Sequence, residues 1–146
     1  MIAIHRVLRG DGNRAATTVT LTYALRCKSR QPLLLDNGER VLLALPRGTV
    51  LRAGDLLQDD DGRLIAVHAA RESLTVASTE DAQLLARACY HLGNRHAPLA
   101  IGEHQICYLQ DHILDALLTG LGLSLRHDHL PFEPEAGAFL SHDHPA

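Results

Sequence analysis

The sequence predicts an α+β protein with a small all-β domain, a second domain that mixes helices with strands, and a flexible C-terminal tail. Three observations carry this prediction. Residues 1–72 show β-type alternation and turn motifs without a helical period. Residues 73–132 alternate between strand-like and helical segments, and residues 133–146 lose all periodicity.

Strand-like segments joined by turns fill residues 1–72. Asn37 and Gly38 lie between two apolar segments, and Asn-Gly is the strongest short-range signal for a hairpin. The acidic cluster 59–61 before Gly62 lacks the alternating oxygen ligands of a Ca²⁺ loop, so we expect a solvated hairpin turn there. The expected strands are 2–8, 17–23, 33–35, 41–45, 56–57 and 64–67.

The second domain begins with a short strand over 74–77 and continues with a helix that starts within 78–81, where hydroxyl and acidic side chains favour a helix N-terminus. We expect Gly93 and Asn94 to end this helix in the left-handed conformation, before Pro98. The remaining expected elements are strands 99–101 and 105–109, a helix from Asp111 to Gly122, and a strand over 123–127. The order β-α-β-β-α-β is that of the ferredoxin-like fold.

Two aliphatic stripes lie on the expected helices of the second domain, Leu85 with Leu92 and Leu114 with Leu118. So small a domain has difficulty covering this much apolar surface by itself. We therefore predict that the second domain forms a dimer.

Composition narrows the range of functions. The 146 residues carry a net charge of −3 and only 3% aromatic side chains, which disfavours duplex binding and base stacking. No apolar segment is long enough for a membrane span, and charges interrupt the N-terminal region where a signal peptide would be apolar. The three cysteines have no metal-site or disulfide spacing. We expect a cytoplasmic protein with no nucleic-acid or membrane partner.

Histidine is the unusual residue of this chain. All but His5 and His68 of the ten histidines fall between His91 and His144. Neutral imidazole is a common ligand of Zn²⁺, Cu²⁺ and Ni²⁺. Two His-x-His pairs, His127 with His129 and His142 with His144, are candidate ligand sets. A solvated surface is the commoner explanation for either pair alone, but the density of histidines favours metal binding.

His96 is the most informative position, because it follows the expected helix end and precedes Pro98 on a short loop. A surface histidine without a role is the simpler interpretation, since one imidazole cannot hold a metal ion. In a two-fold symmetric dimer with this loop near the axis, however, one residue supplies two nitrogens. Tail histidines could complete such a site, whereas His91 is expected to serve packing.

Catalytic motifs are absent from the sequence. It contains no HExxH, no Gly-x-Ser-x-Gly and no glycine-rich phosphate loop. Asp111 and Asp115 are four residues apart on the expected second helix, where they are explained as a cap and an exposed-face residue. The protein is therefore not expected to be an enzyme.

The segment 90–96, Tyr-His-Leu-Gly-Asn-Arg-His, closely resembles the signature of the UreE family of urease accessory proteins, which carry nickel. Further segments agree with this family in order along the whole chain: 28–31, 45–48, 53–55, 111–112 and 132–138.

This resemblance implies a metallochaperone rather than an enzyme. It implies a homodimer with a peptide-binding type of N-terminal domain and a metal-binding C-terminal domain, in which the two copies of His96 share one Ni²⁺. It further implies that the nickel passes to the urease GTPase UreG and the apo-urease activation complex. On the same basis the candidate metal ligands are His96, His112, His142 and His144.

The chain departs from the family pattern in two places. Some members have a histidine two residues before the His112 position, where this chain has Gln110, so a peripheral site at His112 is in doubt. Many members end in a long histidine-rich tail, whereas this tail has only His142 and His144. The expected capacity is a few ions.

Two other functions remain open at this point. One is a chaperone or buffer for Zn²⁺ or Cu²⁺, because either ion competes for the same imidazoles. The other is an adaptor that binds a peptide and whose histidines are incidental. The basic segment 26–30 would suit an acidic partner of such an adaptor, although a solvated loop explains it equally well.

Overall fold

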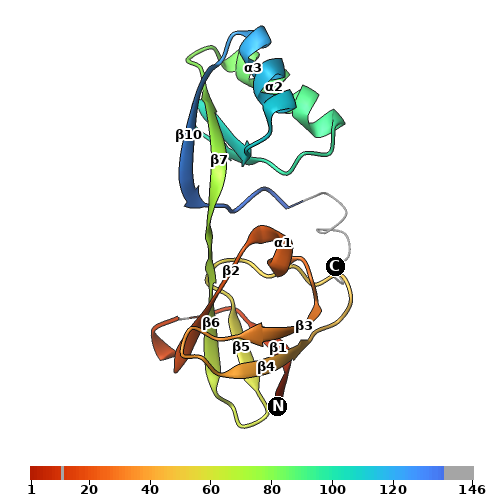
Figure 1. Ribbon diagram of the computed structural model, residues 1–146, viewed down its shortest axis with the longest axis vertical. Coiled ribbons are helices and arrows are strands. Elements are labelled where there is room, and N and C mark those ends of the chain that lie inside the picture. The colour runs from red at the N-terminus through yellow and green to blue at the C-terminus, as the bar shows by residue number, and fades with distance from the viewer. Residues whose placement is uncertain (11, 137–146) are drawn as a thin grey trace. The chain divides into compact units, whose positions relative to one another are not determined.

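The structure is a computed structural model that describes residues 1–10 and 12–136. The chain divides into two compact units, Met1–Ala70 and Arg71–Ala146 (Figure 1). Among the described residues, no helix is long and apolar enough to cross a membrane.

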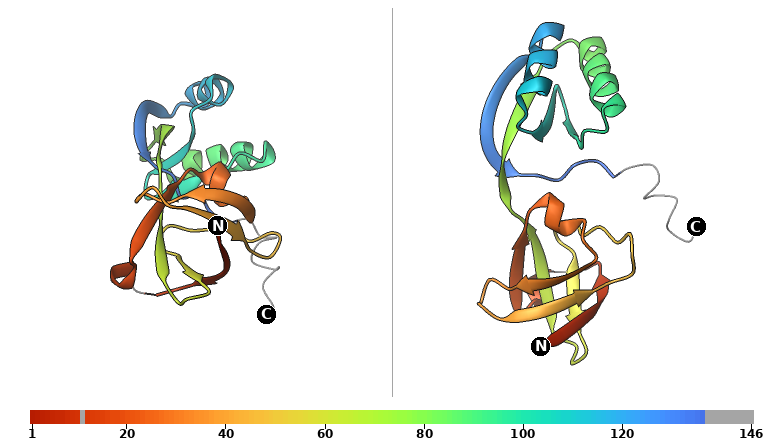
Figure 2. Two further views of the ribbon diagram at one scale, coloured as in Figure 1. Left: turned by 60° about the horizontal axis from the view of Figure 1, so that its bottom comes forward. Right: turned by 45° about the vertical axis from the view of Figure 1, so that its right-hand side comes forward.

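The N-terminal unit contains one six-stranded sheet with the order β2-β6-β5-β1-β4-β3, and Figure 2 shows its strands curving around a common core. β1 pairs with β4 and β2 pairs with β6 in parallel, while the other neighbours are antiparallel. The elements are β1 (Ile2–Leu8), η1 (Gly12–Arg14), β2 (Thr17–Leu21), α1 (Tyr23–Arg26), β3 (Arg30–Leu34), β4 (Arg40–Ala44), β5 (Leu56–Asp59) and β6 (Leu64–Ala69).

Both hairpins expected in this unit are present. Gly38 has φ 91 in the turn between β3 and β4, the left-handed conformation that its lack of a Cβ permits. The single turn of helix α1 was not predicted, because four residues are too few to show a helical period. The expectation that the cluster 59–61 is solvated is wrong for Asp59, which is buried and bound by Arg63.

The C-terminal unit has a four-stranded sheet with the order β10-β7-β9-β8, in which all neighbours are antiparallel. Its elements are β7 (Arg71–Ser78), α2 (Ala82–Asn94), β8 (Ala100–Gly102), β9 (Gln105–Leu109), α3 (His112–Leu121) and β10 (Ser124–Pro131). Both helices cover the same face of this sheet (Figure 2). This arrangement confirms the α+β class and the βαββαβ order.

Local signals define the helices of the C-terminal unit. Asp111 caps α3 as expected, its carboxylate accepting the N–H groups of Ile113 and Leu114, and Gly122 ends α3 with φ 106. The N-cap of α2 is the carboxylate of Asp81 rather than one of the preceding hydroxyls. The last strand extends to Pro131, four residues beyond its expected end at 127, because its pairing with β7 continues to Arg71.

The aliphatic stripes of α2 and α3 are covered within this one chain. Leu92 and Leu118 are fully buried in the core that the helices form on the sheet, and Leu85 and Leu114 are half-buried against it. Because Leu92 and Leu118 are covered within one chain, the stripes alone do not require a dimer, although Leu85 and Leu114 keep part of their surface exposed.

Residues 132–136 follow β10. Phe132 and Pro134 are buried, and the N–H of Glu135 donates to the carbonyl of Leu99 at 2.6 Å. The predicted ligands His142 and His144 lie outside the described residues.

Candidate metal site

Helix α2 ends in a Schellman motif centred on His96. The N–H of Ala97 donates to the carbonyl of Leu92 at 3.1 Å, and the N–H of His96 donates to the carbonyl of Gly93 at 3.0 Å. His96 has φ 58, the left-handed conformation that this motif requires and usually gives to glycine. The expectation that Gly93 or Asn94 takes this conformation is wrong, because both remain helical.

The conformation of His96 has an energetic consequence. A left-handed backbone costs an ordinary L-residue roughly 1–2 kcal/mol relative to the right-handed one, and glycine at this position would avoid that cost. The His96 side chain is exposed, so burial in the core does not offset it. A costly backbone conformation marks a candidate for function, but the exposed His104 shares this conformation, so it does not by itself distinguish His96.

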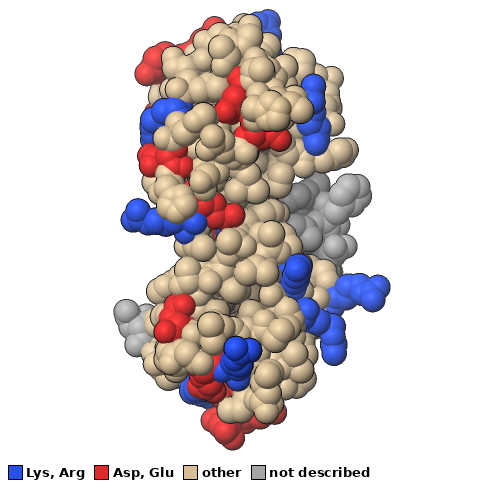
Figure 3. Space-filling model, viewed as in Figure 1, with Lys and Arg blue, Asp and Glu red and all other residues tan. Residues whose placement is uncertain are grey.

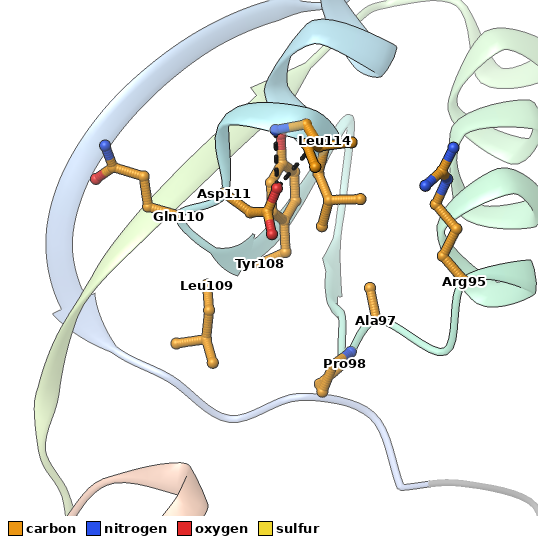
Figure 4. A pocket seen from close by; sticks show the side chains of 9 residues that line it. Arg95, Ala97, Pro98, Tyr108, Leu109, Gln110, Asp111 and Leu114 are labelled. Atoms are coloured by element: carbon orange, nitrogen blue, oxygen red, sulfur yellow. Dashed lines mark hydrogen bonds between the residues drawn. The ribbon is translucent and has the colours of Figure 1, made fainter.

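A pocket of about 390 Å³ lies beside this loop. In Figure 4, the loop after α2 forms one wall, and the segment that leads from β9 into α3 forms another. His96 and His112 belong to these two segments, and both are exposed. The lining residues are Arg95, Ala97, Pro98, Tyr108, Leu109, Gln110, Asp111, Ile113 and Leu114.

One protomer does not assemble a complete metal site from its described residues. Within 1–10 and 12–136, no three His, Cys, Asp or Glu side chains are placed to hold one ion. His96 and His112 are sequence neighbours of residues that line the pocket, but neither lines it, and they do not form a ligand set by themselves. This arrangement leaves coordination to be completed by residues outside the described part or by a second copy.

The prediction that Asp115 is an exposed-face residue is wrong. Its Oδ1 accepts hydrogen bonds from the hydroxyls of Thr75 at 2.7 Å and Tyr108 at 2.6 Å, and its Oδ2 lies 2.7 Å from Nε2 of His127. Burial alone would raise the pKa of this carboxyl, but these three contacts outweigh it and hold the pKa below its ordinary value. Burial, assisted by the adjacent carboxylate, raises the pKa of Tyr108.

Two other histidines of the C-terminal unit have local contacts. The half-buried ring of His91 stands edge-on to Tyr90, with centroids 5.4 Å apart, as a packing residue would. His104 also has a positive φ, 62°, and its ring lies near Glu80 and Glu103 on the turn between β8 and β9.

Charge gives little support to an adaptor for acidic segments. Arg26, the first residue of the basic segment 26–30, is fully buried, with its guanidinium 5.6 Å from the ring centroid of Tyr23. On the face shown in Figure 3, both units carry acidic as well as basic side chains. That face therefore has no single sign of charge in either unit.

Comparison with known families covers both units. The family model for the N-terminal domain of UreE urease accessory protein matches residues 2–70, and the model for the C-terminal domain matches residues 72–146.

Individual relatives are similar over most of the chain. A urease accessory protein UreE from Enterobacter sp. (strain 638) is 52% identical over 128 residues, which cover 87% of this chain and 84% of that protein. One from Alkalilimnicola ehrlichii is 50% identical over 125 residues, covering 86% and 77% respectively. One from Pseudomonas putida (strain GB-1) is 48% identical over 146 residues, covering 99% and 88%. The chain therefore belongs to the UreE family of urease accessory proteins, which are accessory factors of urease maturation and not enzymes.

Proposed function

We propose that this protein is a nickel metallochaperone that binds Ni²⁺ through His96 and delivers it to the urease activation complex. The observation that carries the proposal is the exposed side chain of His96, whose backbone is fixed by the Schellman motif between the pocket residues Arg95 and Ala97. Membership of a urease accessory family supports nickel as the ion. Neutral imidazole is a suitable ligand for it.

A homodimer would bring two copies of His96 to one ion. Leu109 and Ile113 line the pocket beside His96 and are 37% and 57% exposed. Apolar side chains at such positions are suited to packing against a second copy across a two-fold axis. Because each protomer offers only part of a ligand set, a shared site explains how a single exposed histidine contributes to tight binding.

Further ligands are proposed from the C-terminal residues. The N–H of Glu135 donates a hydrogen bond to the carbonyl of Leu99, and Leu99 follows His96 by three residues. His142 follows Glu135 by seven residues, and an extended chain of that length reaches up to about 23 Å. His142 or His144 could therefore complete the coordination of His96, while the exposed His112, between the pocket residues Asp111 and Ile113, is proposed as a peripheral ligand.

The proposed partners are the GTPase UreG and the apo-urease activation complex, with the cytoplasm as the proposed compartment. Cys27, Cys89 and Cys107 are free, which is common in reducing compartments. Zn²⁺ and Cu²⁺ would compete for the imidazoles, so selectivity would depend on geometry, exchange and the receiving partner.

Equilibrium dialysis with Ni²⁺ at pH 7.5 tests this proposal on the wild type and on His96→Ala. We expect the wild type to hold one tight ion per dimer and His96→Ala to lose it, with loss of urease activation in a reconstituted mixture. The matched control is His104→Ala, since His104 is also exposed and has a positive φ. Tight nickel binding retained by His96→Ala, or lost equally in the control, would refute the assignment.

A further inference from the structure

Strand β10 carries two histidines, His127 and His129, that are not among the residues proposed above as nickel ligands. His127 and His129 are two residues apart on the strand, so their side chains leave the same face of the sheet. Leu125 shares that face and packs on the core beneath α3. The pair therefore lies on the helix-covered face, along the edge strand of the sheet.

Helix α3 orients the first of these imidazoles. The 2.7 Å contact between Nε2 of His127 and Oδ2 of Asp115 places the ring proton on Nε2, where it is donated to the carboxylate. The other carboxylate oxygen is held by the hydroxyls of Thr75 and Tyr108, both of which are buried. Asp115 is therefore a fixed acceptor rather than a mobile surface group.

That hydrogen bond selects the tautomer that binds metals. With the proton on Nε2, the lone pair of Nδ1 is available, and the His127 side chain is 51% exposed. A carboxylate that accepts the second ring N–H is the usual companion of a metal-binding histidine, because it fixes the ring and raises its basicity.

The spacing of residues on a strand allows the second imidazole to reach an ion bound by the first. His129 is exposed, and residues two apart on a strand have Cα atoms roughly 6.8 Å apart. Imidazole nitrogens bind Zn²⁺ at about 2.0–2.1 Å. Two parallel side chains at this spacing can thus converge on one ion from the same side.

We propose that His127 and His129 form a metal site for a divalent first-row transition ion, with Asp115 as the positioning residue. Two imidazoles bind the ion and water supplies the remaining ligands, because no third His, Cys, Asp or Glu of the described residues is placed to join them. A site with so few protein ligands holds its ion more weakly than the shared His96 site and exchanges it faster. It extends the proposed metal-carrying role but uses none of the residues proposed for that role.

A purely structural role of the pair is the competing explanation. The His127 contact could serve only to hold β10 against α3, in which case metal would not bind. His129 separates the two explanations, because its exposed ring is not part of the Asp115 contact. Replacing it removes a ligand and leaves the packing of α3 on β10 intact.

The test is Ni²⁺ titration of the full chain at pH 7.5, followed by calorimetry and by NMR of the histidine ring nitrogens with Zn²⁺ as a diamagnetic probe. The variants are His129→Ala, His127→Ala and Asp115→Asn, with His104→Ala as the control. We expect His129→Ala to lose one ion per protomer without a change in the unfolding midpoint. Asp115→Asn should weaken the same site about tenfold to a hundredfold.

The ring signals of His127 and His129 should shift together when Zn²⁺ is added to the wild type. Unchanged stoichiometry in both His129→Ala and His127→Ala, or ring signals that do not respond, would overturn the proposal. The His96→Ala variant keeps the two proposals apart, since it should lose the one tight ion per dimer and retain the ion at His127 and His129. If His96→Ala instead keeps its tight ion, the shared site fails while this site stands or falls on its own variants.

Discussion

The two units use their polar side chains differently. In the N-terminal unit, Arg63 binds Glu39 through two nitrogens at 2.6 and 2.7 Å and Asp59 through a third at 3.0 Å, so one cation is shared by two carboxylates. In the C-terminal unit, Asp115 is held in a comparable network, but His96, His112 and His129 remain exposed.

The comparison distinguishes charged groups that stabilise the fold from imidazoles that are available to bind a metal ion. A cation fixed between two carboxylates is occupied, so it contributes to stability and offers nothing to a ligand. An exposed imidazole adds little to stability and keeps its lone pair available. The Arg63 variant in the first unit should therefore change unfolding alone, and variants of the exposed candidate ligands His96 and His129 in the second should change metal binding.

The largest expected effect on stability comes from Asp115→Ala. It leaves the buried hydroxyls of Thr75 and Tyr108 without their acceptor, and unsatisfied buried polar groups cost about 1–3 kcal/mol each. We expect the free energy of unfolding to fall by about 3 kcal/mol, measured by urea denaturation. Asp128→Ala, on an exposed residue of β10, is the control. A loss equal to that of the control would show that the network does not stabilise the unit.

A smaller loss is expected from Arg63→Met in the N-terminal unit. Asp59 would keep the N–H groups of Asp61 and Arg63 but lose its cation while buried. We expect the free energy of unfolding to fall by about 2 kcal/mol. Nickel binding by dialysis should not change, and Arg47→Met, on an exposed turn residue, should affect neither quantity. Weaker nickel binding in Arg63→Met would break the distinction between the two units.

His96→Gly should increase stability by about 1 kcal/mol, because glycine adopts the left-handed conformation without strain. The same variant should lose tight nickel binding. Thermal denaturation and dialysis measure the two effects on one sample. A destabilised His96→Gly would mean that the histidine side chain supports the fold and is not retained at the expense of stability.

The Asp115 network should make the free energy of unfolding modestly dependent on pH in the acid range. Because the pKa of this carboxyl is lowered in the folded state, its stabilising contribution is present above the ordinary carboxyl pKa near 4 and is lost as the pH falls through the folded value. Urea denaturation between pH 6 and pH 3 should show a steeper loss for the wild type than for Asp115→Asn. Parallel curves would contradict the lowered pKa.

Local signals made most of the fold predictable. The hairpin at Gly38, the cap at Asp111 and the end of α3 at Gly122 depend on residues next to one another in the sequence. The end of α2 was misplaced because Gly93 and Asn94 are acceptable left-handed residues, while the packing of Ala97 near Leu92 decides the position. That contact becomes visible only in three dimensions.

The site was predictable only in part for the same reason. The loop position of His96 follows from Pro98 and the end of the helix, but its positive φ does not. Asp115 meets Thr75 across 40 residues and His127 across 12. Asp115 follows the cap Asp111 by four residues, and nothing in the sequence near it indicates these distant contacts. The sequence therefore predicts an exposed position for it.

The central claim is that two copies of His96 share one nickel ion. Native mass spectrometry of the full chain at substoichiometric Ni²⁺ tests it directly, because it reports protomer number and bound metal together. All proteins carry His129→Ala, which removes the second proposed site. In this background we predict a dimer with one Ni²⁺ for the parent chain and for His104→Ala, and a metal-free species for His96→Ala. A monomer that carries its own tightly bound Ni²⁺, or a His96→Ala protein that retains one ion per dimer, would contradict the shared site.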